Sequence, residues 1–230
     1  MRCFAATLQN TSCLYLLWAS APQPCAEAPV QHSEEFALYQ KYLISDQREK
    51  LINPQIYSAP LTRDGRENIN VLDFGCGHGY VSMYVATMPL PGIRVYACDT
   101  DEECLDVIWG RIAHRGQHNI TAFHLPNYSQ IYLPGWLPKI DYVFCSFSIS
   151  ALEHPDIGLP QIVKQVATGT NFLFVEWDPE KSHPQIDVFV PPARRLRTED
   201  FRQLLKMSGL ALQHEDSGKQ LYYVMRAIKT

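Results

Sequence analysis

Short apolar runs alternate along most of this chain with amphipathic segments. An apolar run bounded by turn residues is typical of a buried strand, whereas apolar residues that recur every three to four positions are typical of a helix. The pattern predicts strands over 68–75, 93–99, 120–125, 140–148, 171–178, 210–216 and 220–229. It predicts helices over 33–44, 46–52, 80–88, 101–116, 159–167 and 199–209.

The order of these elements indicates the fold class. Strands that alternate with helices form a parallel sheet covered on both faces, and the run 140–148 is apolar on both faces, as a central parallel strand should be. The last two strands flank Ser217 and Gly218, a plausible hairpin turn. We therefore predict an α/β protein with a doubly wound, mostly parallel, seven-stranded sheet that ends in an antiparallel hairpin strand at the edge.

The helix over 101–116 is the best specified element. Thr100 and Glu103 have the spacing of a capping box, in which each side chain bonds a free backbone amide of the first turn. Gly116 is a natural left-handed end.

The first residues have a different character. An apolar core of only six residues, 13–18, precedes Ala19-Ser20-Ala21 and resembles a weak signal peptide, and several prolines follow. We expect a poorly ordered extension over 1–32 and one domain over 33–230 that opens with a helical cap. Whether 1–32 is a signal, a tail or a misassigned start stays open.

Composition narrows the class of protein. The chain is 46% hydrophobic and 19% charged, with a net charge of −4, so no basic field suggests a nucleic-acid partner. No apolar run reaches the roughly 18 residues of a membrane span. Seven cysteines contain no C-x-x-C pair, so we expect no metal site. Cys98 and Cys145 lie in strands, which suits a reduced, cytoplasmic protein.

The candidate chemistry lies in "NVLDFGCGHGYVS", where Gly75, Gly77 and Gly79 stand between a strand and a helix. Glycines permit positive φ and let a ligand touch bare backbone, and ligands bind beyond the carboxyl ends of parallel strands. The spacing is G-x-G-x-G, and no G-K-[ST] follows, which argues against a Walker phosphate cradle. Asp99 ends the second strand and could accept hydrogen bonds from two ribose hydroxyls. The alternative is an acid that only starts the next helix.

Four segments, "VLDFGCGHG", "VYACDTDEECL", "NYSQIYLP" and "IDYVFCSF", resemble motifs one to four of class I S-adenosylmethionine-dependent methyltransferases. The branch that includes the ubiquinone- and menaquinone-biosynthesis enzymes is the most similar. The resemblance covers about 45–229 and implies a Rossmann-like fold with S-adenosylmethionine as the cofactor.

The resemblance also implies cofactor contacts for individual residues. Asp73 would orient the glycine loop, Asp99 would hold the ribose hydroxyls, and Asn127 stands where relatives often carry an aspartate that accepts from adenine. The full set is Asp73, Gly75, Cys76, Gly77, Gly79, Asp99, Thr100, Asn127, Tyr128, Ser146 and Phe147.

The acceptor side is less defined, because this family has no universal catalytic residue. Candidates beyond strands four and five are Glu153, His154, Glu176 and Asp178. His154 could act as a base, although a surface or helix-capping histidine is the plainer interpretation. Glu176 could equally be a hydrogen-bonded buried acid.

The segment from 178 to 198 is long for a connection, and long loops often bind ligands. Its Arg194, Arg195 and Arg197 would suit an acidic small-molecule substrate or form a solvated basic stripe. Two rival functions remain open at this point: a nicotinamide- or flavin-dependent oxidoreductase, and a non-catalytic S-adenosylmethionine-binding regulator. The glycine spacing and the terminal hairpin disfavour the first, and the oligomeric state cannot be read from these residues.

Overall fold

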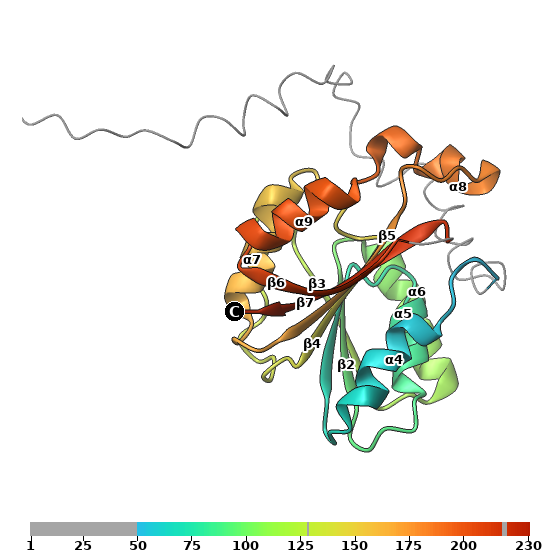
Figure 1. Cartoon of the computed structure of the whole chain (residues 1–230). Coiled ribbons are helices and arrows are strands. Elements are labelled where there is room, and N and C mark those ends of the chain that lie inside the picture. Colours follow the sequence, from blue (N-terminus) through green and yellow to red (C-terminus); the bar gives the residue numbers. More distant parts are fainter. Residues whose placement is uncertain (1–49, 128, 218–219) are drawn as a thin grey trace, which may run out of the picture. The chain divides into compact units, whose positions relative to one another are not determined.

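The computed structural model describes residues 50–127, 129–217 and 220–230, which form a seven-stranded sheet with helices on both faces (Figure 1). In chain order, the elements are α4 (Gln55–Asp64), β1 (Asn70–Phe74), α5 (Tyr80–Ala86), β2 (Arg94–Asp99), α6 (Glu102–Arg115), β3 (Ile120–His124), β4 (Tyr142–Ser146), α7 (Pro155–Gln165), β5 (Asn171–Trp177), α8 (Pro184–Phe189), the 3-10 turn η2 (Pro192–Arg194), α9 (Thr198–Met207), β6 (Leu210–Asp216) and β7 (Tyr222–Lys229).

The strand order is β3-β2-β1-β4-β5-β7-β6, with β1 to β5 parallel and β7 antiparallel to both of its neighbours. The predicted seven-stranded, mostly parallel sheet with an antiparallel terminal hairpin is therefore confirmed. Strand β7 lies one place in from the edge, and β6 is the edge strand. The reason is burial: residues 222–225 of β7 are buried, whereas residues 212–214 of β6 are exposed.

Each face of the sheet has its own apolar core, because successive side chains of a strand point to opposite faces. Helices α4, α5 and α6 pack on the face that carries Val71 and Val95, and α7 and α9 pack on the face that carries Leu72 and Phe74. Figure 1 shows these two groups of helices on opposite sides of the strands. The two cores hold the carboxyl ends of the parallel strands at one common edge.

Two helices were not predicted. Helix α4 contains Pro60 and has little amphipathic character, although Tyr57 and Leu61 lie four residues apart and are both buried. Helix α8 lies inside the segment expected to be a long loop. Both are short and start beside a proline, which hides them from a search for periodicity.

Some expectations fall on undescribed residues. The extension over 1–32, the helix over 33–44 and Gly218 lie outside the described part of the chain. Of the predicted helix over 46–52, Lys50 and Leu51 are described and helical. Among the helices described between residues 50 and 230, none combines the length and apolar character of a membrane span.

The predicted capping box of α6 is wrong by one residue. The N-cap is Asp101, whose side chain accepts from the backbone N–H groups of Glu103 and Cys104 at 2.9 and 3.3 Å. Aspartate is a strong N-cap because its carboxylate satisfies free amides and faces the positive end of the helix dipole. Thr100 is consequently not needed as the cap.

Candidate functional site

The glycine loop leaves β1 at the point where the sheet changes direction. From β1 the chain builds β2 and β3 on one side, and it then returns to build β4 and β5 on the other. The register pairs Phe74 with both Cys98 and Cys145, so the ends of β1, β2 and β4 lie next to one another. A topological switch point of this kind is the usual ligand site of an open α/β sheet.

Backbone hydrogen bonds hold the loop against β2. The N–H groups of Gly75 and Cys76 both donate to Cys98 O, at 2.9 and 3.0 Å. Arg111 of α6 donates to His78 O at 2.7 Å. Gly75, Gly77 and Gly79 all have positive φ, between 50° and 78°. Glycine adopts that region freely, so the sequence spacing predicted the loop correctly.

Gly79 also has a packing role. A Cβ on Gly79 would lie 2.5 Å from two side-chain carbons of Ile108 on α6. The close contact between the start of α5 and α6 therefore requires glycine here.

Asp99 joins the loop to the next helix. Its Oδ2 accepts from the N–H of Gly77 at 2.7 Å, and its Oδ1 accepts from the N–H groups of Thr100 and Asp101 at 2.8 and 3.1 Å. The residue is only 7% exposed. Asp99 therefore fulfils the helix-starting role that the sequence left open, and it also fixes the middle of the glycine loop.

Asp73, near the end of β1, holds the start of the glycine loop through a contact with α5. Ser82 of α5 donates to Asp73 Oδ2 at 2.5 Å, and both residues are buried. This contact ties the end of β1 to the helix that follows the loop.

The cysteines near the loop are neutral, buried thiols. Burial, followed by the nearby Asp99 and Asp73 carboxylates, raises the pKa of the Cys76 thiol well above its ordinary value. A thiolate nucleophile is therefore disfavoured at this position. Within the described ranges, no three His, Cys, Asp or Glu side chains gather as a metal site would require.

The end of β4 supplies polar and aromatic groups beside the loop. Ser146 Oγ and the hydroxyl of Tyr57 lie 2.7 Å apart. The Phe147 ring stacks on Trp177 with centroids 4.1 Å apart, and Phe147 has a positive φ of 58°. A non-glycine residue in this region is strained, and such strain often occurs at functional sites. The sequence missed Tyr57 and Trp177 here, because α4 was not predicted and Trp177 reads as an ordinary strand residue.

Glu176, which precedes Trp177 in β5, is fully buried. Its Oε1 accepts from the N–H groups of Ile149 and Ser150, and its Oε2 accepts from the Ser150 hydroxyl at 2.5 Å. Burial raises the pKa of Glu176 to about 7, against these hydrogen bonds. Its contacts are those of a group that holds the turn after β4, which matches the structural alternative considered for this residue.

The other predicted residues lie further out. Glu153 and His154 precede α7 and are largely exposed, and His154 occupies the N-cap position of that helix without a capping side-chain bond. Asn127 is exposed, and its Oδ1 accepts from the N–H of Gln130 at 2.8 Å. Tyr128 lies outside the described residues. The structure thus brings the glycine loop, Asp99, Ser146 and Phe147 to one edge and leaves Asn127 at its margin, beyond β3.

The arginines of the segment after β5 separate into two kinds. Arg195 is 6% exposed, and it donates to the carbonyl oxygens of Asp178, Lys181 and Val190 and to the Asp187 carboxylate. A guanidinium engaged in this way holds the segment together, so the expectation that Arg195 meets a substrate is wrong. Arg194 and Arg197 are exposed.

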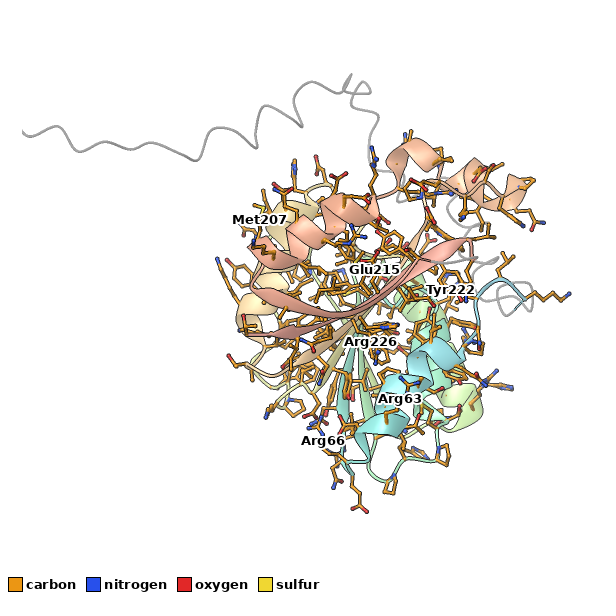
Figure 2. The ribbon with its side chains drawn as sticks, viewed as in Figure 1. Arg63, Arg66, Met207, Glu215, Tyr222 and Arg226 are labelled. Carbon is orange, nitrogen blue, oxygen red and sulfur yellow. The ribbon has the colours of Figure 1, made fainter. Side chains whose placement is uncertain are left out.

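A surface pocket of about 220 Å³ lies elsewhere on the sheet. It is lined by Tyr142 and Asn171, which begin β4 and β5, and by Arg226 of β7. Figure 2 labels Arg226 on this strand. The pocket therefore lies near the amino ends of β4 and β5, whereas the glycine loop lies at the carboxyl ends of the parallel strands.

Comparisons with known proteins find methyltransferases among the families and solved structures that this chain resembles. Residues 72–172 match a family model described as a methyltransferase domain. A SAM-dependent methyltransferase from Aquifex aeolicus superimposes with a TM-score of 0.72 at 21% identity, covering 86% of this chain and all of that one. The [4+2]-cyclase SpnF gives 0.64 at 13% identity, over 76% of this chain and 80% of its own. The glycopeptide N-methyltransferase MtfA, complexed with sinefungin, gives 0.60 at 16% identity, over 78% and 87%.

Among curated proteins, no relative matches the sequence. The structural likenesses are too distant in sequence to show more than the fold, and the narrower branch stays a prediction.

Proposed function

We propose that this chain, which belongs to the class I S-adenosylmethionine-dependent methyltransferases, transfers a methyl group to a small-molecule acceptor. The observation that carries the proposal is the contact between Gly77 and Asp99 at the switch point of the sheet. It places backbone without side chains and a carboxylate together at the ends of neighbouring strands.

The residues present fit this cofactor. Gly75 and Gly77 carry no side chain that would keep a ligand from the backbone, and both have the positive φ that other residues resist. Backbone N–H groups of Gly77, Thr100 and Asp101 hold the Asp99 carboxylate beside the glycine loop. A carboxylate accepts hydrogen bonds from hydroxyl groups, so Asp99 suits a nucleoside whose ribose hydroxyls donate, and the neutral Cys76 adds no competing charge.

When bound, S-adenosylmethionine supplies a methyl group activated by its sulfonium, for an in-line displacement. The chain's own task is then mainly to bind, orient and exclude water. Asp99 and the loop would hold the nucleoside part. Ser146 and Phe147 would face the methionine end of the cofactor, and the turn that Glu176 fixes would shape the space for the acceptor.

An acceptor that holds a proton needs a base. His154 and Glu153 remain candidates because they are exposed at the start of α7, beyond the carboxyl end of β4. The exposed Arg194 and Arg197 favour an acidic acceptor. We infer a cytoplasmic location, supported by free thiols at Cys76, Cys98, Cys104 and Cys145.

The proposed methyltransferase, an oxidoreductase and a non-catalytic regulator predict different results in two experiments. Calorimetry with S-adenosylhomocysteine and, separately, with NAD tests which nucleotide binds. Incubation with methyl-deuterated S-adenosylmethionine and a metabolite extract, followed by mass spectrometry, tests turnover. We expect S-adenosylhomocysteine and one labelled product in equal amounts, and we expect EDTA not to prevent their formation.

The same experiments can overturn the proposal. Binding of NAD without S-adenosylhomocysteine would indicate an oxidoreductase. Tight S-adenosylhomocysteine binding without a labelled product, across extracts of varied origin, would indicate a regulator. Asp99→Ala serves as the inactive control, because it removes the group that the proposal depends on.

A further inference from the structure

Gly110 lies in the middle of α6, where neither the backbone conformation nor the packing of the chain requires a glycine. Its φ is not in the left-handed region, it is exposed, and a Cβ added to it would meet nothing within 4 Å. Gly79 differs, because a Cβ there would collide with Ile108. A glycine in a helix interior costs about 1 kcal/mol relative to alanine. What the missing side chain does provide is room for another backbone to approach closely.

The surface around Gly110 is suited to such an approach. Glu103, Val107, Gly110 and His114 follow one another at spacings of four, three and four residues, so they form one stripe along the helix. All four are exposed, and Val107 keeps 37% of its surface accessible. The opposite side of the helix, with Leu105 and Ile108, is buried against the sheet. The outer stripe therefore has a small, apolar centre.

The charges on α6 are divided between its two halves. Glu102, Glu103 and Asp106 lie in the first half, and His114 and Arg115 lie in the last turn. If two copies of α6 pack antiparallel about a two-fold axis, Val107 of one helix lies level with Gly110 of the other. Glu103 then lies level with His114, and the acidic end of each helix faces the basic end of its partner. A parallel pairing would place like charges together.

We propose that this stripe of α6 binds the same stripe of a second copy, so that the protein forms an antiparallel helix-to-helix homodimer. The complementary charges fix the direction, and Gly110 permits the close approach. The inference is independent of the reaction, because it uses no residue of the glycine loop and does not depend on the cofactor.

The exposed edge of β3, next to α6, is less suited to self-association than the stripe of α6. Strand β3 is an edge strand, and its Asn119 O and Leu125 N bonds face β2, so Ala122 O points outward. Trp109 Nε1 donates to that oxygen at 3.3 Å. The indole therefore caps a free acceptor of the edge, which is one way in which proteins prevent strand-to-strand pairing. We therefore place the proposed contact on α6 and not on the edge of β3.

The first test measures the mass of the full chain in solution by sedimentation equilibrium at several concentrations. We expect a monomer–dimer equilibrium for the wild type. Gly110→Gln should raise the dimer dissociation constant at least about tenfold, because the new side chain separates the helices. It should not lower the melting temperature of the monomer, because the space around residue 110 is open within the chain. Gly135→Gln, at another exposed glycine with no neighbour within 4 Å, is the matched control.

The second test reverses charges. One variant carries Glu102→Lys and Glu103→Lys, and another carries His114→Glu and Arg115→Glu. Each should fail to self-associate, whereas an equimolar mixture of the two should form a heterodimer. A wild type that stays monomeric at every concentration would overturn the proposal. So would a Gly110→Gln dimer as tight as the wild type, or a mixture of the reversed variants that does not associate.

Discussion

The backbone N–H of Gly77 donates to the Asp99 carboxylate across 2.7 Å, and both residues are buried. The other oxygen of the same carboxylate accepts from the first two amides that follow it. One acid therefore fixes the glycine loop after β1 and the entry into α6. Cofactor affinity and the stability of the empty protein consequently depend on the same side chain.

The first prediction concerns Asp99→Ala. The variant removes a buried acceptor from three backbone amides and leaves them unsatisfied. We expect the free energy of unfolding to fall by on the order of 3 kcal/mol, and the affinity for S-adenosylhomocysteine to fall by about 100-fold or more. Chemical denaturation and calorimetry measure the two effects.

Asp99→Asn should be milder, because its amide oxygen still accepts, and Glu67→Ala, at an exposed acid, should change neither quantity. If Asp99→Ala loses stability but binds S-adenosylhomocysteine as the wild type does, the acid only starts a helix, and the proposed cofactor site is wrong.

The strand ends and the glycine loop could be predicted from the sequence, because both depend on local pattern. Apolar runs place the strands, and G-x-G-x-G places positive φ between a strand and a helix. The double role of Asp99 could not be predicted. The Gly77 contact joins residues 22 positions apart and depends on the register of β1 against β2.

Other errors have similar physical causes. Thr100 and Asp101 are both good N-caps, so the choice between them depends on where the strand ends and not on spacing. Tyr57 reaches Ser146 across 89 positions from a helix whose proline weakens its pattern. Arg195 looked like one of three equivalent arginines, and only the path of the chain around it makes it a buried anchor.

The second prediction concerns the pair of Ser82 and Asp73. Ser82→Ala removes the hydroxyl that donates to a buried carboxylate. We expect it to lower the free energy of unfolding by about 1–3 kcal/mol. Asp73→Asn should cost a similar amount alone, and the double variant should cost clearly less than the two single effects added together. A double-mutant cycle by urea denaturation measures this coupling, and strict additivity would show that the contact contributes little.

The third prediction concerns Glu176 and pH. The pKa of about 7 in the folded protein lies above its ordinary value of 4.5, so the folded state holds this proton more tightly than the unfolded state does. The resulting stabilisation is complete below pH 4.5 and is lost as the pH rises to about 7, a change on the order of 3 kcal/mol.

Glu176→Gln should remove this part of the pH dependence, because a glutamine can accept from Ile149 and Ser150 N–H and donate to the Ser150 hydroxyl. Unfolding free energies between pH 4 and 8 measure it, and Glu180→Gln, at an exposed neighbour, should behave as the wild type. An unchanged pH profile in Glu176→Gln would show that folding does not raise the pKa of Glu176.

The last prediction separates the three arginines of the segment after β5. Arg195→Met keeps the bulk of the side chain but removes every donor, which leaves three carbonyl groups and the Asp187 carboxylate without this partner. Loss of this buried, hydrogen-bonded guanidinium should lower the free energy of unfolding by on the order of 3 kcal/mol. A protease should then cut the released segment faster. Arg195→Lys should not rescue it, because one ammonium cannot reproduce the guanidinium fork. Arg194→Met and Arg197→Met are the matched controls, and each should stay within about 0.5 kcal/mol of the wild type. If Arg195→Met is as stable and as protease-resistant as these controls, the guanidinium does not anchor the segment, and its original interpretation as a substrate-binding group is restored.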